Sequence, residues 1–242
     1  MNLWQVLSTS GDNRILVKES GMNDVLVSPK PIENMVFRSS CTGSYLRNID
    51  IEPLQEIWNQ TNKNNFAERM DLLHRRMSKA FIVEKKTHIF TVSSGTDVEY
   101  IPLFLLKCIF ADELRIVNII NGIGELGSNS NIAAAGFSFR PLTPSGKIII
   151  KREKLFSNIK LIETYRNPVC AQDVIAKKFW YDPVIKELSN SNSIVLLHIL
   201  EPSKFGYRMD VFTEIEELIS LYPERLFIYV DACQTRTSPT EQ

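Results

Sequence analysis

The chain has 242 residues, of which 44% are hydrophobic and 23% are charged, with 28 basic and 28 acidic side chains. This composition is that of an ordinary globular protein, and the zero formal net charge provides no basic field for nucleic acid or an anionic membrane. The four cysteines form no CxxC pair, which argues against a zinc site or a secreted disulfide framework. Since we also find no targeting signal and no segment long enough to span a bilayer, we expect a cytoplasmic location.

The first part of the chain reads as an arm followed by helices. Turn residues interrupt short apolar runs over residues 1–48. Between Ile49 and Phe81, apolar residues recur at helical spacing, which predicts two helices. We therefore treat residues 1–80 as an N-terminal arm with its helices.

From residue 88 the pattern alternates between strands and helices. Strands are predicted over 88–94, 114–120, 158–165, 193–200 and 225–231, and helices over 97–110, 171–189 and 210–222. The strands are apolar at nearly every position, as a parallel sheet requires when helices cover both of its faces. The sequence thus predicts a three-layer α/β fold with a mostly parallel sheet.

The end of the first predicted strand carries a candidate phosphate site. Its residues are Ser94, Gly95, Thr96 and Asp97. Small hydroxyls and free backbone N–H groups at the start of a helix favour a phosphate, and glycine lets the backbone approach closely. The same residue types are also preferred as ordinary helix caps, so both interpretations stay open.

A glycine-rich loop follows the second predicted strand. Residues 122–127 contain the pattern G-x-G-x-x-G, which occurs in dinucleotide-binding proteins. That motif requires an immediate helix and a carboxylate at the end of the next strand, about 20 residues further on. Residues 145–151 contain no carboxylate. An NAD(P)-dependent oxidoreductase is therefore kept only as an alternative.

Two later strands carry polar residues near their ends. His198 lies on the strand 193–200, where a packed core histidine is the ordinary interpretation, and Lys204 in the next loop reads as solvent-exposed. Asp231 ends the last apolar strand, and Gln234 follows it. A carboxylate at the carboxyl end of a parallel strand is well placed to meet a ligand.

With the turn at 94–97 and the D-A-C-Q of residues 231–234 both at strand ends, the chain resembles the large domain of pyridoxal-phosphate enzymes of fold type I. The closest groups are class V aminotransferases, cysteine desulfurases and kynureninases, and the resemblance covers about residues 85–236. It implies that the turn binds the cofactor phosphate, that Asp231 pairs with the pyridine nitrogen and that Gln234 binds the ring hydroxyl. His198 matches the start of the family's H-x-x-N pattern and joins this cofactor-binding set.

The chain also departs from the family. Glu125-Leu126 stands where a Glu-His pair is expected, so Leu126 or the small residues beyond it would cover the ring, and Glu201 replaces the asparagine. The family's Schiff-base lysine lies on a later strand, and no lysine follows Asp231. We therefore expect residues 81–242 to be a partial large domain, truncated at its C-terminus and inactive as given. Because two anions repel, we expect Asp97 to cap the helix rather than to bind phosphate.

The resemblance implies an aminotransferase or lyase that acts on an amino acid or another primary amine and forms a homodimer. A buried carboxylate keeps the pyridine nitrogen protonated, so that the ring can accept electrons. The leading alternative is a noncatalytic interaction protein, in which a partner chain covers the sheet edge of a degenerate scaffold.

Overall fold

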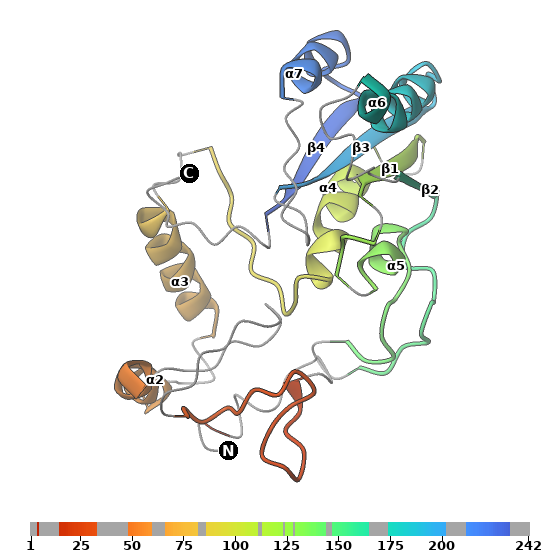
Figure 1. Cartoon of the computed structure of the whole chain (residues 1–242). Helices are drawn as coiled ribbons and strands as arrows, with labels where there is room; N and C mark the ends of the chain where they lie inside the picture. The colour runs from red at the N-terminus through yellow and green to blue at the C-terminus, as the bar shows by residue number, and fades with distance from the viewer. Residues whose placement is uncertain are drawn as a thin grey trace. The chain divides into compact units, whose positions relative to one another are not determined.

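The structure is a computed structural model, shown in Figure 1. It divides into two compact units, which are described separately: Met1–Ser93 with Arg236–Gln242, and Ser94–Thr235. The residues that the structure describes are 4, 15–32, 48–59, 66–81, 86–110, 113–122, 124–127, 129–143, 147–164, 174–201 and 212–232.

The described part of the first unit contains two helices, α2 (Asn48–Asn59) and α3 (Phe66–Ala80), as the helical spacing predicted. The strand predicted over residues 88–94 is wrong, because this segment has no strand structure and exposes Phe90 and Val92. Apolar composition alone does not make a strand, since the backbone groups of a strand need a neighbouring strand to pair with.

The second unit is built around a parallel sheet with the strand order β2-β1-β3-β4. The strands are β1 (Arg115–Asn121), β2 (Ile159–Thr164), β3 (Ser193–Leu200) and β4 (Leu226–Asp231). Each lies within two residues of a predicted strand, and the α/β class is confirmed. Strand β2 lies on one side of β1 and β3 on the other, so the strand order reverses between β1 and β3. In open α/β sheets ligands bind at this place, beyond the carboxyl ends of the strands.

Helices cover both faces of this sheet (Figure 1). In chain order they are η3 (Asp97–Glu99), α4 (Tyr100–Phe110), α5 (Ser130–Ala134), α6 (Val174–Leu188) and α7 (Phe212–Leu221). The longer predicted helices are thus confirmed. No described helix combines the length and the apolar character that crossing a bilayer requires.

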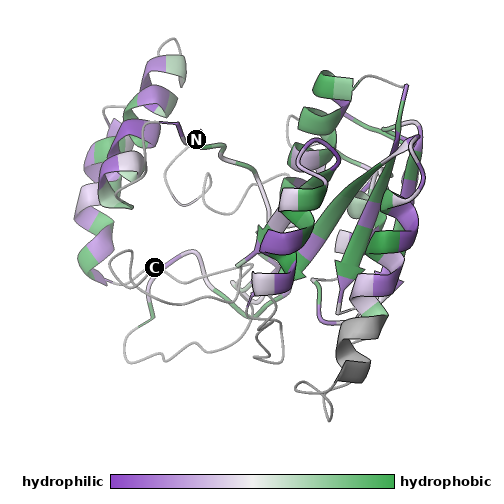
Figure 2. Cartoon of the chain, turned by 90° about the horizontal axis from the view of Figure 1, so that it is seen from above, coloured by the Kyte–Doolittle hydropathy of each residue, from purple (hydrophilic) through white to green (hydrophobic). Residues whose placement is uncertain are grey.

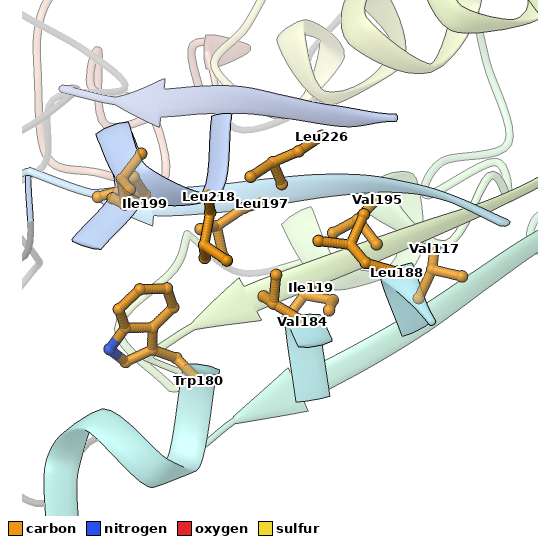
Figure 3. Close-up of a cluster of buried hydrophobic side chains, with 11 residues drawn as sticks. Val117, Ile119, Trp180, Val184, Leu188, Val195, Leu197, Ile199, Leu218 and Leu226 are labelled. Carbon is orange, nitrogen blue, oxygen red and sulfur yellow. The ribbon is translucent and has the colours of Figure 1, made fainter. Parts of the chain in front are cut away.

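The main core lies between the sheet and helices α6 and α7. Alternate strand residues point to one face of a sheet. On this face, valine, leucine and isoleucine side chains of β1 and β3 pack against the helices (Figure 3). Trp180, Val184 and Leu188 come from α6, and Leu218 comes from α7. Complete burial of each such side chain stabilises the fold by about 1.5–3 kcal/mol.

The intervening strand residues face α4 and α5. Ile116, Ile194 and Leu196 pack against Leu103 and Leu106 of α4. Figure 2 shows the predominantly apolar strands, with helices on either side of the sheet. By the same alternation, the even-numbered residues of β3 and the odd-numbered residues of β4 belong to this face. This places His198 and Asp231 on the side of the sheet that α4 covers.

An ion-pair network closes the amino-terminal end of the strands. Glu187, near the end of α6, is buried and accepts hydrogen bonds from Arg115 at 3.0 Å and from Lys160 at 2.6 Å. Arg115 also donates to the hydroxyl of Ser193 at 3.2 Å. These contacts join the first residues of β1 and β3 and the start of β2 to helix α6.

Gly122, the first residue after β1, cannot be replaced without strain. Its φ is +108°, and a Cβ there would lie 3.1 Å from Leu200 Cδ1 and 3.3 Å from Glu125 Oε1. We expect Gly122→Ala to lower the free energy of unfolding by about 1–3 kcal/mol, measured by urea denaturation. Gly124→Ala is the matched control, since Gly124 also has a positive φ of +82° but has nothing within 4 Å of its Cβ position. Equal losses in the two variants would contradict a steric contribution at Gly122.

Candidate functional site

His198 and Asp231 lie on neighbouring strands, near the carboxyl ends of β3 and β4. In the register of this strand pair, His198 lies opposite Tyr229 and Leu200 lies opposite Asp231. The rings of His198 and Tyr229 contact each other, with centroids 4.3 Å apart. The sheet therefore brings these two predicted site residues together, although they are separated by a whole helical crossover in the sequence.

A third residue, Glu99, completes a buried group that we call the carboxyl-edge trio: Glu99, His198 and Asp231. Glu99 ends η3, two residues after Asp97, and its Oε2 is 3.6 Å from His198 Nδ1. On the other side of the ring, His198 Nε2 is 3.9 Å from Asp231 Oδ2. The imidazole therefore lies between the two carboxylates, and one polar atom from each residue lies within 4.8 Å of the others.

The trio is almost completely withdrawn from water. The side chains of His198 and Glu99 are 0% and 1% exposed, and that of Asp231 is 15% exposed. Among the described residues, Glu99 Oε2 and both ring nitrogens of His198 have no hydrogen-bond partner. The distances of 3.6 Å between Glu99 and His198 and of 3.9 Å between His198 and Asp231 exceed the usual hydrogen-bond range. Buried polar atoms without a partner are rare in folded proteins and suggest a role.

Burial determines how the trio is charged. Burial, and to a smaller extent the nearby negative charge of Asp231, together raise the pKa of Glu99 from 4.5 to about 9. Burial also lowers the pKa of His198, an effect that Asp231 opposes. At neutral pH, Glu99 therefore carries a proton and His198 is uncharged.

The turn at 94–97 is held by an ion pair that the sequence did not reveal. Arg140 Nη2 lies 2.8 Å from Asp97 Oδ1 and 2.9 Å from Oδ2, with both side chains 12% exposed. The hydroxyl of Ser94 donates to Asp97 Oδ2 at 2.7 Å. Asp97 is the first residue of η3, whose N-cap position is occupied by Thr96, and its carboxylate binds Arg140 and Ser94. The expected capping role of Asp97 is wrong.

Backbone amides remain available in this turn. Asp97 N donates to Ser94 O at 3.0 Å, whereas the amides of Gly95 and Thr96 make no hydrogen bond with any described residue. A Cβ built on Gly95 would meet nothing within 4 Å, so the backbone there is open. Thr96 is buried and the Ser94 hydroxyl is already engaged, so an anion would be bound by amides rather than by these hydroxyls.

The glycine loop after β1 lacks the features of a dinucleotide site. The helix that follows it, α5, has only 5 residues. Residues 147–151 contain no strand, and the next strand is β2, whose Glu163 comes roughly twice as far along the chain as the motif's spacing of about 20 residues. Leu126 packs with Ile120, Ala134 and Leu200 in a buried cluster, so it would have to leave that cluster to cover a ring.

Sequence reasoning missed Glu99 and Arg140, and one predicted residue cannot be placed. Gln234 lies outside the described residues, as does Lys204. Glu99 lies within the predicted helix 97–110 and is not singled out by the sequence pattern. Its burial depends on β3 and β4, which are far away in the sequence. A polar residue directly before an apolar helix was the one available signal.

Comparison of the chain with protein-family models, with curated proteins and with solved structures finds no match. The resemblance to pyridoxal-phosphate enzymes thus stays a prediction from the motifs, and the case for a function depends on the geometry of this edge of the sheet.

Proposed function

We propose that the carboxyl edge of this sheet binds pyridoxal phosphate, as the cofactor-binding part of an enzyme that acts on an amino acid or another primary amine. The observation that carries the proposal is the proximity of Glu99 to Asp231. Their carboxylates lie within 4.8 Å, and Glu99 follows Asp97 by only two residues. Two residues span at most about 7 Å, so the turn and Asp231 lie within reach of one small ligand.

The charges of the site suit a phosphorylated pyridine. At one end, the open backbone at Gly95 precedes the combined helix η3–α4, whose dipole attracts an anion. Arg140 neutralises Asp97 there, which removes the repulsion that argued against a phosphate beside this residue. At the other end, Asp231 supplies a carboxylate for a protonated ring nitrogen.

When bound, pyridoxal phosphate supplies an electron-accepting ring to a substrate amine. The residues of this chain would orient it: the turn fixes the phosphate, and Asp231 holds the proton on the ring nitrogen. The proposal concerns noncovalent binding by the residues of this sheet edge. The sheet edge does not select between transamination and elimination.

The test uses pyridoxamine 5′-phosphate, which keeps the ring and the phosphate but has no aldehyde to react with surface lysines. We expect the wild-type chain to bind it reversibly in isothermal titration calorimetry. Asp231→Asn should weaken binding by about 10-fold to 100-fold, since a charge-assisted hydrogen bond contributes about 1.5–3 kcal/mol. Pyridoxamine without phosphate should bind much more weakly to the wild type.

Asp182→Asn is the matched control, because Asp182 is exposed on α6, which covers the other face of the sheet. It should bind like the wild type. Equal affinities of the wild type and Asp231→Asn would show that Asp231 does not contribute to ligand binding. A complete lack of binding by the folded wild type would reject the cofactor and favour the noncatalytic interaction protein.

A further inference from the structure

Three buried polar atoms of the carboxyl-edge trio face one another. Glu99 Oε2 and His198 Nδ1 are 3.6 Å apart, and neither has a hydrogen-bond partner among the described residues. His198 Nε2 also has no hydrogen-bond partner among the described residues and lies 3.9 Å from Asp231 Oδ2. Leaving such buried polar groups unsatisfied is costly. Small side-chain rotations that close these gaps would satisfy all three atoms at once.

Two kinds of arrangement could satisfy the trio, namely a shared metal ion and a chain of protons. An ion would need one nitrogen of the ring and both carboxylates around a single point. One ring nitrogen and one oxygen of each carboxylate do lie within 4.8 Å of one another, but the closest approach to Glu99 is from Nδ1 and the closest approach to Asp231 is from Nε2. A ring with a different nitrogen toward each carboxylate matches a proton chain better than a metal centre.

We propose that Glu99, His198 and Asp231 form a proton relay that runs from the interior of the protein to the carboxyl edge of the sheet. In this relay the Glu99 carboxyl O–H donates to His198 Nδ1, and His198 Nε2–H donates to the carboxylate of Asp231. Glu99 and His198 act as positioning residues, which keep Asp231 ionised and oriented. The edge therefore selects a ligand with a cationic N–H group at Asp231, whether or not that ligand is a pyridine.

The direction of the relay follows from burial. A charge is most costly where water is farthest away. Of the two carboxyl groups, the more buried one should therefore be the protonated one. Glu99 is 1% exposed and Asp231 is 15% exposed, which puts the proton on Glu99 and the negative charge on Asp231. The raised pKa of Glu99, about 9, agrees with this assignment.

Other charged groups near Glu99 do not reverse this order. In the described residues they include His198 on β3, Asp231 on β4, Asp97 and Tyr100 beside Glu99 in the chain, and Arg140, which binds Asp97. Arg140 pairs with Asp97 and so compensates its charge. Burial raises the pKa of Tyr100 to about 12, so its hydroxyl stays neutral.

The test is nuclear magnetic resonance of the ligand-free chain with labelled histidine and glutamate, so it does not depend on cofactor binding. The chain has 3 histidines, and replacing His74 or His88 by glutamine identifies the signals of His198. We expect a neutral His198 with its proton on Nε2 at about pH 7, protected from exchange with water. The carboxyl carbon of Glu99 should titrate with a midpoint near pH 9.

Two variants separate a relay from a merely structural cluster. Glu99→Gln keeps an N–H donor toward Nδ1, so His198 should keep its Nε2 proton and lose the spectral change near pH 9. In Asp231→Asn the midpoint of Glu99 should move to lower pH, because the carboxylate that opposes its ionisation is gone. An unmoved midpoint would show that the groups are not coupled.

Three results would overturn the relay. The first is a proton on Nδ1, and the second is a doubly protonated ring at neutral pH with Glu99 ionised. The third is stoichiometric binding of added Zn²⁺ that is lost in His198→Gln, which would make the trio a metal site. Because all three are read without pyridoxamine phosphate, failure of the relay is distinguishable from failure of the proposed cofactor.

Discussion

Replacing Glu99 by glutamine is expected to stabilise the folded chain at neutral pH, by an amount that grows as the pH rises. The pKa of Glu99 is about 9 in the folded chain and 4.5 as its ordinary value. At a pH between these two values, Glu99 has lost its proton in the unfolded chain but keeps it in the folded chain. The stability of the wild type therefore falls with rising pH, by up to about 1.4 kcal/mol per pH unit.

Glutamine has no proton to lose, so the variant does not show this fall. The free energy of unfolding of Glu99→Gln minus that of the wild type should be about 3 kcal/mol larger at pH 7 than at the ordinary pKa of Glu99, 4.5. It should stop growing once the pH passes about 9. This is a large fraction of the about 5–15 kcal/mol by which most domains are stable.

Urea denaturation of both proteins at a series of pH values measures this difference. Glu217→Gln is the matched control, since it makes the same chemical change at an exposed position of α7. A difference between Glu99→Gln and the wild type that stays constant from acid to alkaline pH would mean that Glu99 ionises normally in the folded chain.

The second large effect is expected at Arg140. Arg140→Met removes the cation that lies 2.8 Å from Asp97 Oδ1, and leaves a largely buried carboxylate without that compensation. Breaking a buried ion pair from one side costs about 3–5 kcal/mol, and we expect a loss near the lower value because the pair is not fully buried. The affinity for pyridoxamine phosphate should fall as well, since the uncompensated charge of Asp97 repels phosphate.

The double variant Asp97→Asn, Arg140→Met tests whether the uncompensated charge of Asp97 causes the loss of stability in Arg140→Met. Removing both charges should recover part of the lost stability, because no uncompensated carboxylate remains. Lys154→Met controls for loss of a positive charge at an exposed position of the same unit and should have little effect. If the double variant is no more stable than Arg140→Met, the lost stability comes from packing of the arginine chain over Phe139.

The sheet could be predicted from the sequence because its strands are short runs rich in branched apolar residues, bounded by turns. β3 is buried at each of its residues, and its bounds agree with the predicted 193–200. The segment 88–94 contains a shorter run of the same residue types but forms no strand. What distinguishes the two is the presence of pairing neighbours, which periodicity along one segment does not reveal.

The site was predictable only where a residue ends a strand. Asp231 was singled out because it ends an apolar strand, and His198 because it interrupts one. Glu99 and Arg140 have no such signal, since each becomes part of the site through contacts with distant residues. The partner of Asp97 is 43 positions away in the sequence, and no local rule predicts that distance.

The two ends of the sheet are far apart, and the charge at the amino-terminal end is compensated locally. Strands of this length are roughly 20 Å long, and the buried carboxylate of Glu187 is paired with Arg115 and Lys160. The network around Glu187 at one end therefore has little influence on the protons of the trio at the other. Protein engineers can strengthen the helix α6 end to offset instability caused by substitutions at the opposite end, without altering the chemistry under test there.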